Sequence, residues 1–241
     1  MTTHLLKKLV MLGVFDDKGK PYFLGGSVTE ADGFRTHTFT DDGTLEIVNG
    51  GYIQVLVVGR GGNGGSGSSA YPGPFRGGGG GGAGVVYRSS LLVTDTVSIT
   101  VGKTYTIPRG ADSHFGSLLT ALGGGGGGTG SYSGGAGRDG GSGGGNGQRY
   151  YDFPTLSAGV GLQPGSEWGG YGTNGTKSVS GGKGGSANFS NPFTGAQLSK
   201  GGAPGQSYPQ AGTYYGDGGD GGYGVAGAVG RQGIVMVRYE L

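Results

Sequence analysis

The sequence contains no cysteine, and it is poor in charge, in proline and in large aliphatic residues. Without cysteine, the 241-residue chain can form neither a disulfide nor a thiolate metal site. Its 17 basic and 15 acidic residues leave a net charge of only +2, which gives no electrostatic basis for binding nucleic acid. No stretch approaches the roughly 20 apolar residues of a transmembrane helix, so we expect no membrane insertion.

Glycine is abundant instead, with 66 residues, about four times its usual share. It does not recur strictly at every third position, and proline is scarce, which excludes collagen. A flexible linker is the simplest interpretation of so much glycine. However, strand-like sequence encloses the glycine-rich body at residues 52–58 and 234–239. We therefore expect the terminal strand to pair with an early strand, and the body between them to be ordered.

Local patterns add further expectations. Residues 55–58 are apolar without a break, which is typical of a strand covered on both faces. The Asp42–Gly43 pair lies between two strand-like segments and predicts a hairpin. Near the start of the chain, Leu5, Leu6 and Leu9 could form one face of a short helix.

Two hexaglycine runs, 77–82 and 123–128, raise the question of what ordered glycine can form. Polyglycine can adopt an extended threefold helix rising about 3.1 Å per residue, with backbone polar groups that must find partners on neighbouring helices. We predict a mainly β fold in which N-terminal hairpins and strands close a body of packed polyglycine-II helices with protruding loops. The predicted domains are an attachment segment at 1–33 and a glycine-rich domain at 34–241, with a β framework at 34–58, 85–101 and 233–241 and a polyglycine body at 59–84 and 102–232.

The order of several sequence blocks carries a resemblance. TFTDDGTLEI, YIQVLVVGRGGNGG, GGGGGGAGVVYRSS, TVSITVGKTYTI and GIVMVRYEL together resemble the glycine-rich domain of bacteriophage tail-fibre and tail-tip proteins, over about residues 34–241. The resemblance implies a receptor-binding adhesin on the phage tail, whose loops contact a bacterial outer-membrane protein or a surface glycan. It also implies that the N-terminal region contacts another tail-fibre or tail-tip protein of the virion.

The segments between the glycine runs are the candidates for recognition. They combine aromatic residues with Ser, Asn and Arg, as antibody binding loops do, and loops on a rigid scaffold commonly carry binding functions. The candidate receptor-binding residues are Tyr71, Phe75, Arg149, Tyr150, Tyr151, Phe153, Trp168, Tyr171, Phe189, Phe193, Tyr208, Tyr214 and Tyr215. The alternative is that these aromatic side chains fill gaps beside glycine segments. Tyr52, Tyr87 and Tyr239 lie in expected strands, and we predict that they are packing residues.

Catalysis and cofactor binding have little support in the sequence. Neither His37 nor His114 has a catalytic motif beside it. GGAGRD matches the start of a calcium-binding nonapeptide, but that motif works by tandem repetition and no second copy follows. Asp217 and Asp220 could bind a cation, although a solvated turn is the better interpretation. We expect no metal, no cofactor and no enzymatic activity.

Three other functions compete with the adhesin. A structural tail-fibre assembly protein would have the same scaffold without host contact. An ice-binding protein would need a regular Thr/Ala face, whereas the inserts here are irregular and aromatic. An enzyme acting on surface polysaccharide would need paired carboxylates, and the inserts carry few acids, chiefly Asp152, Glu167 and Asp217.

Overall fold

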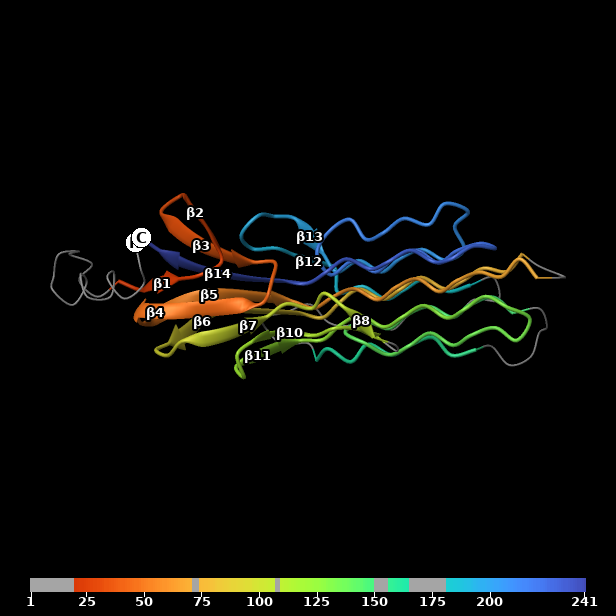
Figure 1. Cartoon of the computed structure of the whole chain (residues 1–241), viewed down its shortest axis with the longest axis horizontal. Coiled ribbons are helices and arrows are strands. Elements are labelled where there is room, and N and C mark those ends of the chain that lie inside the picture. Colours follow the sequence, from red (N-terminus) through yellow and green to blue (C-terminus); the bar gives the residue numbers. More distant parts are fainter. Residues whose placement is uncertain (1–19, 71–73, 107–108, 150–155, 165–180) are drawn as a thin grey trace.

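The molecule is elongated, with β-sheets at one end and extended glycine-rich segments over the rest of its length (Figure 1). The computed structural model describes residues 20–70, 74–106, 109–149, 156–164 and 181–241. These residues form a mainly β structure of open sheets, with no helix among them. The predicted helical face of Leu5, Leu6 and Leu9 lies outside the described residues.

Two antiparallel five-stranded sheets form the framework. The first contains, in spatial order, β1 (Tyr22–Leu24), β4 (Gly43–Asn49), β7 (Val97–Thr100), β10 (Ser113–Phe115) and β11 (Leu119–Ala121). The second contains β2 (Ser27–Ala31), β3 (Phe34–Phe39), β14 (Ile234–Glu240), β5 (Gly51–Val58) and β6 (Val85–Val93). Two short ribbons join β8 (Tyr105–Thr106) to β9 (Arg109–Gly110) and β12 (Phe189–Ser190) to β13 (Gln197–Leu198).

The last strand of the chain lies between two early ones. Val235 of β14 is opposite Phe39 of β3 on one side and Val57 of β5 on the other, and both pairings are antiparallel. The prediction that the terminal strand pairs with an early strand is therefore confirmed. Because β5 leads into the glycine-rich body and β14 leads out of it, this pairing joins the two ends of the body.

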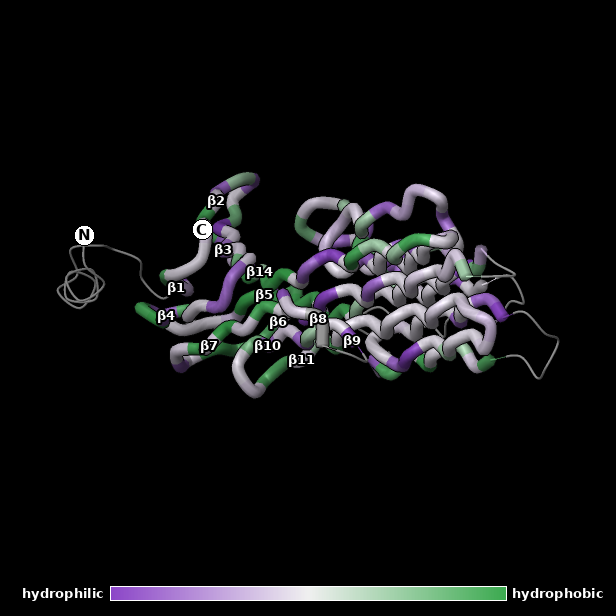
Figure 2. The backbone as a smooth tube through the Cα atoms, turned by 45° about the vertical axis from the view of Figure 1, so that its right-hand side comes forward, coloured by the Kyte–Doolittle hydropathy of each residue, from purple (hydrophilic) through white to green (hydrophobic). Residues whose placement is uncertain are grey.

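Residues 55–58 of strand β5 are buried on both faces, as their uninterrupted apolar sequence predicts. Val55 and Val57 belong to the hydrophobic cluster between the two sheets, together with residues such as Leu45 of β4 and Phe115 of β10. Leu56 and Val58 point to the other face, into a second cluster with residues that include Leu198, Ile234 and Met236. Full burial of each such side chain contributes about 1.5–3 kcal/mol. The apolar core is thus concentrated in the framework, where Figure 2 shows the hydrophobic strands.

The hairpin predicted at Asp42–Gly43 is wrong. β3 and β4 belong to different sheets, so the chain crosses from one sheet to the other between them. At this crossing, the Asp42 carboxylate accepts the N–H of Val101 at 2.7 Å. A true hairpin joins β2 to β3 through Asp32 and Gly33, whose positive φ angles of 52° and 77° fit a type I′ turn. The predicted domain boundary after residue 33 falls in this turn, and pairing of β2 with β3 ties residues 27–31 to the framework.

The glycine-rich segments lie side by side and are joined by backbone hydrogen bonds (Figure 2). Residues 77–84 show the pattern most fully, because N–H groups three residues apart donate to the same neighbouring segment. Gly77, Gly80 and Ala83 donate to segment 216–222, Gly78, Gly81 and Gly84 to segment 122–128, and Gly79 and Gly82 to segment 182–185. Carbonyl groups of residues 77–84 accept hydrogen bonds from segments 59–65, 142–145 and 202–205.

The same three-residue step explains why residues 77–82 are all glycine. A Cβ atom at any of these positions would lie closer than 3.0 Å to a backbone carbonyl oxygen of another segment. Gly77 and Gly80 face segment 62–65, Gly78 and Gly81 face segment 142–145, and Gly79 and Gly82 face segment 199–202. The hexaglycine run is therefore a requirement of close packing on three sides.

Candidate functional site

Large side chains extend from the glycine-rich body at its surface and at its turns, whereas its interior holds small polar ones such as the buried Ser142 and Asn146. Segment 59–67 illustrates the rule, because Gly61, Gly62, Gly64 and Gly65 each face a neighbouring backbone closer than 3.0 Å. The intervening residues, Asn63 and Ser66, are half-buried and exposed. Any recognition chemistry of the body must therefore come from its turns and its flanks.

The turns at the end farthest from the sheets form the first candidate surface, which we name the distal surface (Figure 1). Its described aromatic residues include Tyr132, which is 54% exposed, and Tyr208, which is 86% exposed. The Arg76 guanidinium lies 5.2 Å from the centre of the Tyr223 ring. The backbone N–H of Arg76 donates to Oε1 of Gln148 at 2.9 Å, which links two of the turns.

A loop formed by residues 206–215, the flank loop, continues from the distal surface along the body. It begins beside the distal turns, because Tyr223 donates its N–H to the Gln206 carbonyl at 2.9 Å. It displays Tyr208 and also Tyr214, which is 43% exposed. Tyr208 therefore belongs to both surfaces and connects them.

Asp217 lies beneath the flank loop and is only 4% exposed, so its interpretation as part of a solvated turn is wrong. Burial raises the pKa of its carboxyl group above the ordinary value, although hydrogen bonds from the N–H groups of Tyr214, Lys200 and Thr213 oppose the shift. Asp220 is half-buried on the same segment. In the described part of the chain, no group of three His, Cys, Asp or Glu residues could hold a metal ion.

The predicted receptor-binding residues separate into three groups. Tyr208 and Tyr214 are exposed. Arg149 is half-buried. The remaining described ones pack against the framework or the body: Phe75, Phe189, Phe193 and Tyr215. Tyr71, Tyr150, Tyr151, Phe153, Trp168 and Tyr171 lie outside the described residues.

Phe75 is 2% exposed, so its side chain is inaccessible to a receptor and that prediction needs correction. Phe189, Phe193 and Tyr215 pack against the second hydrophobic cluster, where Phe189 and Phe193 also lie 6.4 and 6.0 Å from the Tyr87 ring. The gap-filling interpretation fits these aromatic residues. Tyr87, predicted to be a packing residue because it lies in an expected strand, is partly buried against the same cluster.

Two exposed aromatic residues differ from what the sequence predicted. Tyr132, which lies between two serines, is not among the predicted candidates. It interrupts glycine-rich sequence as many of the candidates do, and that signal could have identified it. Tyr52 is 66% exposed, so the expectation that it packs is wrong, whereas Tyr239 is 3% exposed as expected. Tyr52 lies opposite Leu92 of β6, which is 52% exposed, and this pair forms an apolar surface at the sheet end of the molecule.

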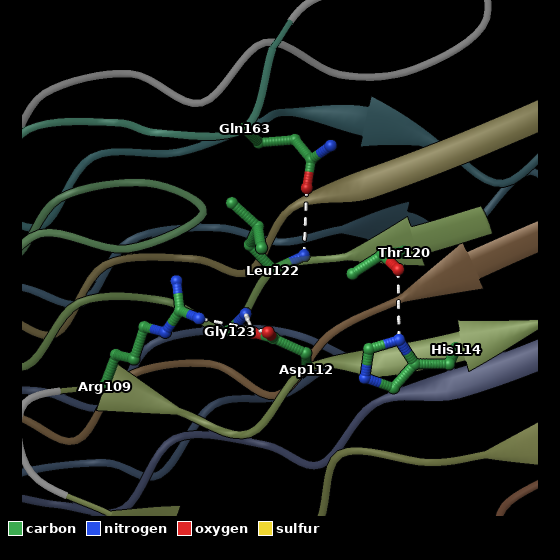
Figure 3. Close-up of polar contacts among 7 residues, drawn as sticks. All are labelled: Arg109, Asp112, His114, Thr120, Leu122, Gly123 and Gln163. Carbon is green, nitrogen blue, oxygen red and sulfur yellow. Dashed lines mark hydrogen bonds and ion pairs between the residues drawn. The ribbon is translucent and has the colours of Figure 1, made fainter. Parts of the chain in front are cut away.

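The junction between framework and body is held by side-chain acceptors (Figure 3). Oδ1 of Asp112 accepts the N–H of Gly123 at 2.8 Å, and its Oδ2 accepts from Arg109 at 3.0 Å. Oε1 of Gln163 accepts the N–H of Leu122 at 2.9 Å. These acceptors satisfy N–H groups at the point where β11 passes into the second hexaglycine run.

Both described histidines have local structural partners. Nδ1 of His114 lies 3.0 Å from the Thr120 hydroxyl oxygen on the neighbouring strand (Figure 3). His37 is buried, and its Nδ1 lies 2.7 Å from the Gly25 carbonyl oxygen. Burial lowers the pKa of His37 below 6.5, the Gly25 carbonyl opposes this effect, and the Arg35 charge adds to it.

Open antiparallel sheets that anchor a body of hydrogen-bonded glycine segments define the class of the protein as an all-β glycine-rich scaffold. The chain belongs to the glycine-rich domain family, whose model matches residues 38–240. No curated protein matches the sequence. Among the described residues, no helix is long and apolar enough to span a membrane.

Proposed function

We propose that the protein is an adhesin of a phage tail fibre or tail tip, and that it binds a bacterial outer-membrane protein or surface glycan. The observation that supports this proposal is that the packed glycine backbone and the exposed tyrosines occupy different parts of the molecule. The interior glycine positions of the body have no room for a side chain, while exposed tyrosines lie at the distal surface and on the flank loop. Tyrosine supplies large, rigid contact area at low entropic cost, which suits recognition.

The scaffold would be a lattice of polyglycine-II helices. Hydrogen bonds that repeat every three residues, and six bonded segments around residues 77–84, support this assignment. Each hydrogen bond contributes about 1 kcal/mol net, which offsets the cost of about 0.5–1 kcal/mol for ordering glycine rather than alanine. A dense lattice of this kind gives the loops a rigid base.

The sheet end would attach to another tail-fibre or tail-tip protein. The exposed Tyr52–Leu92 pair supports this orientation, because exposed apolar patches on a soluble protein commonly mark interfaces. A groove of about 470 Å³ lies at the same end, and its lining includes Phe34, Tyr52 and Arg238. The same features favour a second candidate function, a tail-fibre assembly protein without host contact.

Binding to bacteria tests the proposal directly. The fluorescently labelled protein is incubated with a panel of Gram-negative strains, and bound protein is measured by flow cytometry. Saturable binding to some strains, lost after protease treatment or periodate oxidation of the cells, supports an adhesin and separates a protein receptor from a glycan. The adhesin is refuted if no strain binds while the protein co-purifies with phage tails, and the assembly function is then favoured.

A further inference from the structure

Two aspartates on segment 216–222 connect the flank loop to the glycine-rich body. Asp217 and Asp220 are three residues apart, which is the step at which this body repeats its hydrogen bonds. Each carboxylate uses one oxygen for the scaffold. Oδ1 of Asp217 accepts the N–H of Lys200 at 2.8 Å, and Oδ1 of Asp220 accepts the N–H of Ala203 at 2.8 Å.

The second oxygen of each carboxylate holds the flank loop. Oδ2 of Asp217 accepts the N–H groups of Thr213 and Tyr214 at 3.2 and 2.8 Å. Oδ2 of Asp220 accepts the N–H of Gln210 at 3.1 Å. Both carboxylates therefore bridge a scaffold segment and the loop in the same way.

Backbone hydrogen bonds make these contacts reciprocal. The N–H of Asp217 donates to the Tyr214 carbonyl at 3.0 Å, and the N–H of Asp220 donates to the Gln210 carbonyl at 3.1 Å. The loop is thus fixed at two points, at Gln210 and at Thr213–Tyr214, on either side of residues 211–212. Hydrogen bonds to a charged acceptor are stronger than those between neutral groups.

The loop held in this way presents aromatic side chains to the solvent. Residues 204–216 contain no charged side chain of their own, whereas Arg60, Lys103 and Arg231 line a groove together with Ala211 of the loop. Tyr208 and Tyr214 are the exposed aromatic residues of the loop.

We propose that Asp217 and Asp220 are positioning residues that hold the flank loop as a rigid recognition surface. This inference rests on the proposed function, because it assigns Tyr208 and Tyr214 to receptor contact. Preorganisation of the loop removes part of the ordering cost of binding. If the loop were no longer held, the side chains of Tyr208 and Tyr214 would have to be ordered on binding. We expect this to weaken receptor affinity roughly tenfold, since about 1.4 kcal/mol corresponds to a factor of ten.

Asparagine variants test the positioning role, because Asn retains one acceptor oxygen and replaces the other with a donor amide. Asp217→Asn and Asp220→Asn are compared with Asp139→Asn as a matched control. Asp139 also accepts a backbone N–H within the body, that of Val160 at 2.6 Å, but it does not hold the flank loop. Thermal melts monitored by circular dichroism verify that each variant folds.

Amide hydrogen exchange gives the first readout and needs no receptor. We expect faster exchange at Thr213 and Tyr214 in the Asp217 variant and at Gln210 in the Asp220 variant, and no change at these amides in the Asp139 variant. Unchanged exchange at these amides, or equal acceleration in the Asp139 variant, would overturn the positioning role. This result stands even if no strain in the panel binds the protein.

Binding to a strain selected from the panel gives the second readout. We expect about tenfold weaker binding for each of the Asp217 and Asp220 variants, larger losses for Tyr208→Ala and Tyr214→Ala, and no change for the Asp139 variant. Normal binding by the tyrosine variants would refute receptor contact through this loop. If the tyrosine variants bind weakly and the aspartate variants bind normally, the positioning role of the aspartates is refuted, while receptor contact through the tyrosines stands.

Discussion

Substitution of Gly81 by alanine tests whether the glycine body is a packed structure. Its N–H donates to the Gly125 carbonyl at 2.7 Å, and its carbonyl accepts the N–H of Gly62 at 2.8 Å. An added Cβ would lie closer than 3.0 Å to the Ser142 carbonyl oxygen, which itself accepts the N–H of Gly125. The methyl group must therefore displace a neighbouring segment.

The expected cost follows from these contacts. Displacement of segment 142–145 strains two or three hydrogen bonds, each contributing about 1 kcal/mol. Alanine recovers about 0.5–1 kcal/mol of backbone entropy relative to glycine. The net loss is about 2 kcal/mol. For a chain of this size that corresponds to a fall in Tm of about 4–8 °C, since each kcal/mol shifts Tm by about 2–4 °C.

Thermal unfolding followed by circular dichroism measures this loss. Ser66→Thr is the matched control, because it adds one methyl group at an exposed position of a segment that contacts residues 77–84. Such a surface substitution should change stability by less than about 0.5 kcal/mol. A Tm for Gly81→Ala equal to that of the parent would refute close packing, and an equal fall in both variants would show that the effect is not specific to the interior.

Three further predictions concern the framework and its junction with the body. The folded state lowers the pKa of His37, so the unfolded chain binds a proton first as pH falls below 6.5. The free energy of unfolding, measured with urea, should therefore decrease as pH falls through this range. His37→Gln should flatten this dependence of stability on pH. Asp112→Ala should lower the free energy of unfolding by about 1–3 kcal/mol in the same assay, because it leaves the N–H of Gly123 without its charged acceptor. An unchanged unfolding midpoint would contradict the role of Asp112 in joining the framework to the body. Phe23→Ala should cost about 3–5 kcal/mol because this side chain is fully buried in the framework, whereas a detached N-terminal segment would tolerate the change.

The strands at residues 52–58 and 234–239 were predictable because their cause is local. The prediction of a polyglycine body over 102–232 was too broad, because β10 and β11 lie within it and belong to a framework sheet. The unbroken apolar run at residues 55–58 indicated burial on both faces, and Val55 and Leu56 do enter different clusters. The Asp42–Gly43 turn shows the limit of such reasoning. Turn propensity is a local property, but the sheet to which β4 belongs depends on pairing with β1 and β7, which lie elsewhere in the sequence.

The exposure of the candidate receptor-binding residues was not predictable residue by residue. Phe75 and Tyr208 both interrupt glycine-rich sequence, yet one is buried and the other exposed. The difference arises from segments distant in the sequence that cover one side chain and leave the other uncovered. The role of Asp217 was likewise hidden, because its partners Lys200 and Tyr214 come close only in the folded chain.

The three-residue step of the hydrogen bonds restricts how the chain can change its length in evolution. One residue inserted within 77–82 would turn every later glycine towards a different neighbour, so that Gly81 would face the segment that Gly82 faces now. Insertions in multiples of three would keep each residue facing its own neighbour and would lengthen the body by about 9 Å per triplet. Turns carry no such periodic constraint. We therefore expect natural relatives to vary freely in loop length, while their glycine segments differ by whole triplets.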